Sequence, residues 1–157
     1  MKPVLALFLA LAAIPVAYSQ GMVVDKFMMI TIAVGNMDKA KEFYTMLGLK
    51  ATQDYSQAGQ RWVALALPGG GASINLSTVL SSGKSATVEN LKPGTVSLYF
   101  STPDVEAVWK DLKEKGVTLT HEISKESWAG SPWAAWFSVS DPDGNQVLIV
   151  QLKSPGQ

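Results

Sequence analysis

Apolar segments alternate with polar ones along the chain, and their lengths separate strands from helices. Short apolar runs are typical of strands, and they occur at residues 27–34, 49–55, 61–67, 72–77, 96–101, 117–123, 133–139 and 146–151. Two other segments repeat apolar residues every three or four positions, which predicts one-sided helices that begin after Asn36 and after Asp104. The predicted order is therefore strand, helix and three strands, followed by the same order again.

The last two predicted strands flank the turn Asp141-Pro142-Asp143-Gly144-Asn145. Pro142 sets φ for the second position of a turn, and Gly144 adopts a left-handed conformation without steric cost. Two apolar runs on either side of such a turn predict a β-hairpin.

The two halves repeat each other at fixed spacings. The helix starts Asn36 and Asp104 are 68 residues apart, and so are the helix ends Gly48 and Gly116. Further along, the spacing becomes 74, as in the pairs Trp62/Trp136, Pro68/Pro142, Gly70/Gly144 and Ile74/Leu148. A longer loop in the second half accounts for the change. We predict two like modules, at 24–80 and 94–153, that share a core and are joined by a polar linker at 81–93.

Composition narrows the class of protein. Hydrophobic residues make up 47% of the 157 residues and charged residues 17%, as in a packed globular domain. The formal net charge is zero, so we expect no nucleic-acid partner. The absence of cysteine excludes disulfides, thiolate catalysis and cysteine-bound zinc.

The first residues have the layout of a secretory signal peptide. Lys2 precedes an apolar run at residues 3–18, and Ala17 and Ser19 supply the small residues of a cleavage site. The run is shorter than the roughly 20 residues of a membrane-spanning helix. We therefore expect residues 1–19 to be removed and the protein to be periplasmic or secreted, without stable membrane contact. An uncleaved anchor is the alternative.

Two strand-helix-three-strand modules resemble the vicinal oxygen chelate superfamily, which contains glyoxalase I, extradiol dioxygenases and bleomycin-resistance proteins. The resemblance covers roughly residues 27–152, and its motifs are the segment 34–49 with Phe43-Tyr44 and Leu47-Gly48-Leu49, the segment 104–108, and the 141–145 turn. It implies an α+β fold in which two tandem βαβββ modules form curled mixed sheets around a cleft.

Enzymes of this family usually hold a divalent metal in the cleft, with His, Glu or Gln ligands from the first and last strand of each module. The resemblance puts these positions at Met29, Ile74, Ser97 and Leu148. None of these side chains suits a catalytic divalent ion, so we expect no metal cofactor, as in the bleomycin-resistance-like branch. A carboxylate site built from Asp54, Glu122 or Glu126 is conceivable, but no spacing supports it.

Tryptophan is concentrated near the last hairpin. Trp128, Trp133 and Trp136 lie close together in the sequence, and Trp62 is the first-half counterpart of Trp136. A cleft lined by aromatic side chains suits a small apolar or aromatic molecule. The candidate ligand contacts are Met29, Trp62, Ile74, Ser97, Trp128, Trp136 and Leu148. The alternative for Trp62 and Trp136, which the pattern favours, is packing in the core or between modules.

His121 is the single histidine and the one candidate general base, although a surface role at a strand end explains it better. Gly69-Gly70-Gly71 lacks the lysine of a phosphate-binding loop and is interpreted as a turn.

Three functions follow from these observations. The first is an exported, metal-free protein that binds a small molecule in an aromatic-lined cleft. The second is a glyoxalase-like lyase or isomerase, or a dioxygenase-type enzyme, with a non-standard site. The third is an interaction protein whose cleft is filled by its own side chains. Because modules of this family pair within a chain or swap between chains, a homodimer is also open.

Overall fold

The computed structural model describes residues 26–78, 91–125 and 128–154. The elements are β1 (Met29–Val34), α1 (Met37–Met46), β2 (Lys50–Gln57), β3 (Gln60–Ala66), β4 (Ser73–Thr78), β5 (Ser97–Ser101), α2 (Val105–Glu114), β6 (Leu119–Ser124), β7 (Trp133–Ser140) and β8 (Gln146–Leu152). The predicted strand and helix order is confirmed. The predicted signal peptide (1–19) and most of the predicted linker (81–93) lie outside the described residues.

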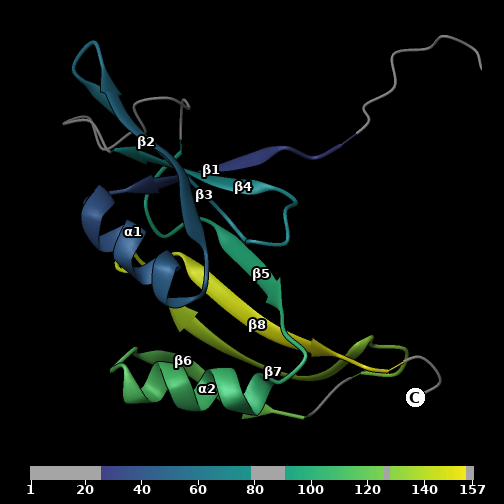
Figure 1. Ribbon diagram of the computed structural model, residues 1–157. Coiled ribbons are helices and arrows are strands. Elements are labelled where there is room, and N and C mark those ends of the chain that lie inside the picture. The colour runs from purple at the N-terminus through teal and green to yellow at the C-terminus, as the bar shows by residue number, and fades with distance from the viewer. Residues whose placement is uncertain (1–25, 79–90, 126–127, 155–157) are drawn as a thin grey trace, which may run out of the picture.

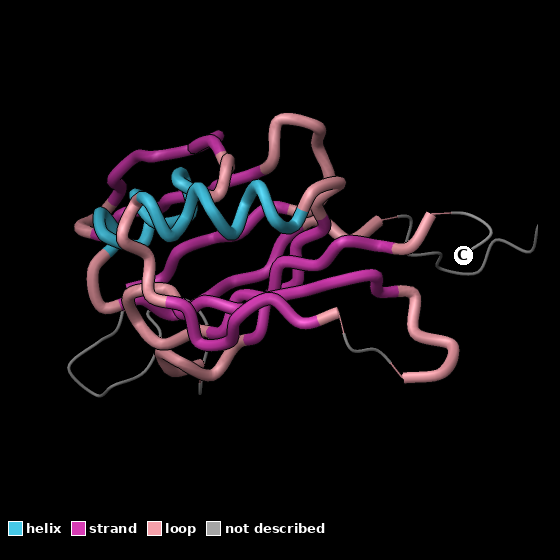
Figure 2. The backbone as a smooth tube through the Cα atoms, turned by 90° about the horizontal axis from the view of Figure 1, so that it is seen from below, coloured by secondary structure: helices cyan, strands magenta, loops and turns pink. Residues whose placement is uncertain are grey.

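The strands form two four-stranded mixed sheets, ordered β1-β4-β3-β2 and β5-β8-β7-β6. In each sheet the first strand runs parallel to the last, and the other pairs are antiparallel. Figure 1 shows the first module above the second, with α1 between the first sheet and the start of β8. Seen from below, α2 runs along the strands of the second sheet (Figure 2). The predicted α+β fold of two βαβββ modules is confirmed.

Both helices begin and end where the sequence predicts. The Asn36 side chain accepts hydrogen bonds from the backbone N–H groups of Asp38 and Lys39, both at 3.0 Å, and Asp104 caps α2 in a similar way. After α1, Gly48 has a φ of 94°, a left-handed conformation that ends a helix readily only when no Cβ is present.

Each helix covers one face of its own sheet and closes a hydrophobic core. The fully buried side chains include Ile32, Val63 and Leu76 from the first sheet and Phe137 and Val147 from the second. These residues belong to one continuous apolar cluster that draws on both modules. The opposite face of each sheet is therefore the part of the module left for other contacts.

The hairpin turn at 141–145 joins the two modules. The buried Tyr44 hydroxyl on α1 donates to Asp141 Oδ2 at 2.8 Å, and Gly35 N donates to Asp143 Oδ1 at 2.7 Å. A Cβ at Gly35 would lie 3.0 Å from that same oxygen, so the lack of a side chain at Gly35 favours this close approach. The turn is thus both a hairpin connection and the contact that fixes one module against the other.

Among the described residues, no helix has the length and apolar character needed to cross a membrane.

Candidate functional site

Strand register identifies the side chains on the free face of each sheet. In the first sheet, Thr31, Asn75, Ala64 and Gln53 stand side by side on β1, β4, β3 and β2. In the second, Tyr99, Leu148, Ser138 and His121 occupy the same row on β5, β8, β7 and β6. Successive strand residues alternate between faces.

The neighbours of these rows show which face is free. Asp54, next to Gln53, bonds Lys41 of α1, and Glu122, next to His121, bonds Trp109 of α2. Since Asp54 and Glu122 face the helices, both rows face away from them.

An aromatic surface covers this free face of the second module. It consists of Tyr99, His121, Trp128, Trp133 and Trp136. Trp133 lies at its centre, with ring centroids 6.1 Å from Tyr99, 5.3 Å from Trp128 and 6.3 Å from Trp136. Tyr99 and Trp128 are both 60% exposed, so the surface is open to solvent. The structure thus brings together two of the predicted contacts, Trp128 and Trp136.

His121 forms one side of this surface. Its ring stacks on Trp136 with centroids 4.4 Å apart and planes 24° apart. Its Nδ1 lies 2.7 Å from the carbonyl oxygen of Glu122, which can only accept, so Nδ1 carries the proton. In the neutral ring, Nε2 then holds a free lone pair. The side chain is exposed, as the surface interpretation expects, but it also contacts a candidate binding residue.

The first module repeats this arrangement with different chemistry. Trp62, the counterpart of Trp136, donates its indole N–H to Gln53 Oε1 at 2.7 Å. Gln53 occupies the position in β2 that His121 occupies in β6. Each follows a register shift, between Ala51 and Gln53 in β2 and between Leu119 and His121 in β6. Trp62 lines a pocket with Tyr55, Gln57, Ala58, Gln60 and Arg61, all from its own module. Among the described residues, the lining of this pocket comes from the first module alone, so Trp62 and Trp136 do not share it.

The register corrects one predicted position. Leu148 lies opposite Tyr99, and its counterpart opposite Thr31 is Asn75, so Ile74 was wrong as the equivalent residue. The connection from β3 to β4 is one residue longer than that from β7 to β8. Val139 pairs with Val147, eight residues further on, whereas its counterpart Leu65 pairs with Ile74, nine residues further on. A shift of one residue moves a strand side chain to the other face. Ile74 is buried on the α1 side, and Asn75 faces the free side.

The remaining predicted contacts are spread over the molecule. Ser97 and Ile74 line a pocket between the modules together with Phe27, Tyr99 and Phe100. Leu148 is buried between Tyr99 and Ser138, and Met29 is partly buried on the edge strand β1. The predicted set thus divides among the aromatic surface, the inter-module pocket and the first sheet.

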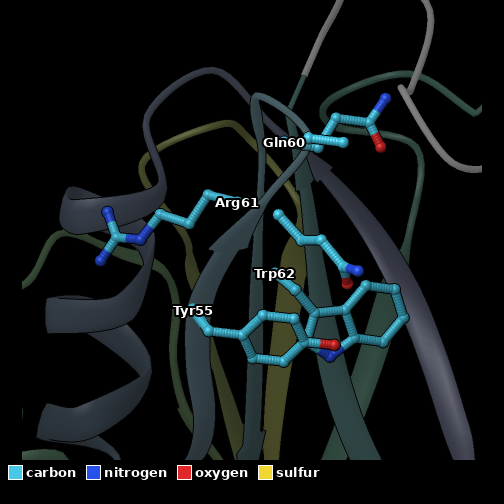
Figure 3. A pocket seen from close by; sticks show the side chains of 6 residues that line it. Tyr55, Gln60, Arg61 and Trp62 are labelled. Carbon is cyan, nitrogen blue, oxygen red and sulfur yellow. The ribbon is translucent and has the colours of Figure 1, made fainter.

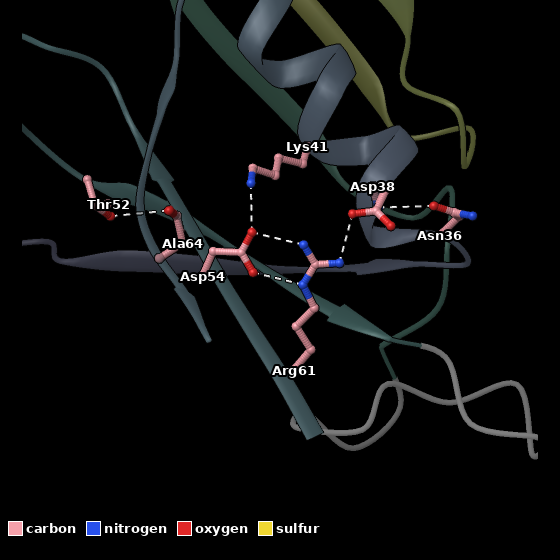
Figure 4. Close-up of polar contacts among 7 residues, drawn as sticks. All are labelled: Asn36, Asp38, Lys41, Thr52, Asp54, Arg61 and Ala64. Carbon is pink, nitrogen blue, oxygen red and sulfur yellow. Dashed lines mark hydrogen bonds and ion pairs between the residues drawn. The ribbon is translucent and has the colours of Figure 1, made fainter. Parts of the chain in front are cut away.

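The carboxylates considered as metal ligands have other partners. Asp54 accepts from Arg61 Nε at 2.8 Å and from Lys41 Nζ at 2.6 Å (Figure 4). The hydrogen bond from Arg61 is the main cause that holds the pKa of Asp54 well below its usual range, and the hydrogen bond from Lys41 adds to it. Hydrogen bonds from Trp109 and then Lys113 likewise lower the pKa of Glu122.

Asp54 and Glu122 lie in different modules, and Glu126 is outside the described residues. In the parts of the chain that the structure describes, no three His, Asp or Glu side chains come together to hold a metal ion.

Sequence reasoning missed Tyr99 and Gln53. Tyr99 lies two residues after Ser97 and therefore shares its face of the strand, which is a signal the sequence carried. Gln53 is 68 residues before His121, the same spacing as the helix ends. Contact between Tyr99 and Trp133, in contrast, depends on strand pairing across the sheet.

Comparison with known proteins agrees with this architecture. A family model described as Glyoxalase/Bleomycin resistance protein/Dioxygenase superfamily matches residues 26–149. Uncharacterized protein YurT of Bacillus subtilis is 32% identical over 130 residues, which cover 80% of this chain and 98% of YurT.

Solved structures with the same fold include proteins of different activities. TnmS3, an antibiotic binding protein from Streptomyces, is 26% identical with a TM-score of 0.66, over 85% of this chain and all (100%) of TnmS3. A lactoylglutathione lyase from Agrobacterium tumefaciens has a TM-score of 0.61 over 82% of this chain and 94% of the lyase, and at 19% identity this shows a shared fold alone. The resemblance inferred from the sequence motifs is confirmed: the chain belongs to the Glyoxalase/Bleomycin resistance protein/Dioxygenase superfamily.

Proposed function

We propose that this protein binds a small apolar or aromatic molecule on the aromatic surface of its second module, without a metal. The carrying observation is the connected set of rings around Trp133, with Tyr99 and Trp128 each 60% exposed. Exposed aromatic side chains that touch each other offer a large, rigid apolar area to a flat ligand. The similarity to TnmS3, an antibiotic binding protein, supports the same conclusion.

Binding is tested by titrating the protein with a panel of flat aromatic compounds while tryptophan fluorescence is recorded. We expect saturable quenching by at least one compound, and an affinity about tenfold or more weaker in Trp128→Ala, since exposed aromatic anchors carry much of a binding energy. The matched control is Trp109→Phe, because Trp109 lies on α2 and hydrogen-bonds Glu122 on the helix side of the sheet. No quenching across the panel, or equal affinity in Trp128→Ala, would overturn the proposal.

The proposal that binding needs no metal is tested by a separate measurement. Elemental analysis of gently purified protein should find no stoichiometric divalent metal, and added divalent ions should leave the melting temperature unchanged. About one equivalent of zinc, iron, manganese or nickel would make a metal-dependent enzyme the first hypothesis instead.

A second candidate function is catalysis by His121 on a small carbonyl or aromatic substrate. Its support is the exposed ring with Nδ1 held by the Glu122 carbonyl, which leaves Nε2 available as a base beside Trp136. Turnover that disappears in His121→Ala and in His121→Gln, while ligand binding persists, would favour this function over simple binding.

We also propose that the protein is exported after removal of residues 1–19. The support is the charge, apolar run and small residues described above. Amino-terminal sequencing of protein recovered from the periplasm or culture medium should begin at Gln20. The homodimer stays a prediction, and light scattering on the same sample would test it.

A further inference from the structure

The free face of the first sheet carries aromatic rings together with uncharged amides. Tyr55 on β2 pairs with Trp62 on β3, and Gln57 pairs with Gln60 at the end of the same hairpin. All four line one pocket of about 280 Å³. Figure 3 shows the Tyr55 and Trp62 rings at this pocket, whereas Arg61 points away toward α1.

The amides around these rings match hydroxyl groups in their hydrogen bonding. Gln53 Oε1 accepts from Trp62 Nε1 at 2.7 Å, which fixes the indole and leaves the Gln53 amide nitrogen as a donor. Each glutamine amide both donates and accepts, and a hydroxyl group does the same. Flat aromatic faces bordered by such amides suit a ring that is apolar on its face and polar at its edge.

Asn75, one row along the sheet from Trp62, adds a buried acceptor. Its side chain is fully buried, and Oδ1 has no hydrogen-bond partner, while Nδ2 lies 3.4 Å from Thr31 Oγ1. A buried carbonyl oxygen without a donor is unfavourable. The equivalent position in the second module is Leu148, so the fold itself does not require an amide here. The unpaired oxygen points to a donor group supplied by a ligand.

The cationic residue of the pocket is neutralised from the other side. Arg61 donates through Nε and Nη2 to Asp54 and through Nη1 to Asp38, at 2.8 to 2.9 Å (Figure 4). With its charge taken up by two carboxylates, Arg61 does not favour an anionic ligand.

We propose that Gln53, Tyr55, Gln57, Gln60, Trp62 and Asn75 form a second binding site, for an uncharged saccharide. One sugar ring stacks on Trp62 and Tyr55, its hydroxyl groups exchange hydrogen bonds with the glutamine amides, and one hydroxyl or amide N–H donates to Asn75 Oδ1. The site lies in the other module from the aromatic surface and does not depend on the function proposed for that surface.

Isothermal titration of the purified protein with N,N′-diacetylchitobiose and with maltose tests this site. We expect binding of at least one sugar with a dissociation constant of about 1 mM, and a loss of about tenfold or more in Trp62→Leu. The matched control is Trp136→Leu, the equivalent residue of the second module, which should keep the wild-type affinity. No heat from either sugar, or equal weakening by both substitutions, would overturn the proposal.

Asn75→Leu separates a ligand contact from a structural role. It places in the first module the residue type that the second module has at this position. We expect a melting temperature equal to or above that of the wild type, together with loss of sugar binding. A lower melting temperature with sugar binding intact would show that Asn75 serves the fold and would overturn its part in the site. Titration with aromatic compounds should be unchanged in Asn75→Leu, so failure of one site is distinguishable from failure of the other.

Discussion

The two aspartates of the hairpin turn differ in how completely their carboxylate oxygens are hydrogen-bonded. Asp141 is satisfied at both oxygens: Oδ1 accepts from Asp143 N and Asn145 N, and Oδ2 accepts from Tyr44 Oη and Asn145 Nδ2. Asp143 accepts from Gly35 N through Oδ1, but its Oδ2 is buried and has no partner. Burial raises the pKa of Asp143, and the nearby charge of Asp141 adds to this, while the Gly35 N–H opposes it.

Asp143→Asn should therefore stabilise the protein at neutral pH, by about 1 kcal/mol or less, because it removes a partly buried charge with one unpaired oxygen and keeps an acceptor for Gly35 N–H. Because the folded-state pKa of Asp143 is raised, its contribution to stability is greatest below the unfolded pKa and is lost as pH rises through the folded pKa. The melting temperatures of Asp143→Asn and the wild type, compared at pH values from about 3 to 7, provide the measurement. The advantage of Asp143→Asn over the wild type should grow as the pH rises.

Asp141→Asn is the matched control. It removes one of the two acceptor oxygens on which four donors converge, so it should lower the melting temperature at neutral pH. Equal effects of the two substitutions would contradict the assignment of different roles to the two carboxylates.

At the scale of elements, each module uses one carboxylate on its second strand to attach the helix. Asp54 on β2 bonds Lys41 of α1 and Arg61 of β3, and Glu122 on β6 bonds Trp109 and Lys113 of α2. The bonded partners differ, but the two carboxylates occupy equivalent positions, because Glu122 follows Asp54 by 68 residues, the spacing that separates the two helix starts. The repeat therefore keeps a helix-to-strand link while its residues change.

Asp54→Asn should lower the melting temperature slightly, and added salt should reduce the difference from the wild type, because exposed ion pairs are screened. The pKa of Asp54 is held low, so its contribution is present above the unfolded pKa and is lost as pH falls through the folded pKa. Melting curves at low and high salt provide the measurement. Asp111→Asn, which breaks the pair between α2 and its C-cap residue Lys115, is the control expected to show a smaller change.

At the scale of the whole molecule, the same fold occurs twice with two kinds of free face. The row of Tyr99, Leu148, Ser138 and His121 borders an aromatic surface, whereas the row of Thr31, Asn75, Ala64 and Gln53 is mostly polar. Both modules depend on one turn for their relative position, through Tyr44 and Gly35.

Tyr44→Phe tests this dependence. It removes the hydroxyl that donates to buried Asp141, and burial together with that carboxylate raises the pKa of Tyr44 so that the hydroxyl stays protonated. We expect a loss of about 1–3 kcal/mol in the free energy of unfolding by urea, since a charged acceptor loses a buried donor. Tyr99→Phe, at a ring that is 60% exposed, should leave this free energy nearly unchanged.

Local physics made much of the fold predictable from the sequence. Apolar periodicity indicated the strands and helices, Asn36 and Asp104 marked the helix starts, and Gly144 marked the hairpin turn. Each of these features depends on neighbours within a few residues, so the sequence displays it directly. The repeat spacing also predicted that the modules would be alike, which the two sheet orders confirm.

The tertiary structure decided which side chains share a surface. One additional residue between β3 and β4 put Asn75, rather than Ile74, on the free face, because strand side chains alternate with a period of two. Pairing of β5 with β8 and of β8 with β7 brought Tyr99 to Trp133 across the sheet. Register and strand order are non-local, and for this reason the sequence determined the modules and their turns, while only the folded chain determined the candidate sites.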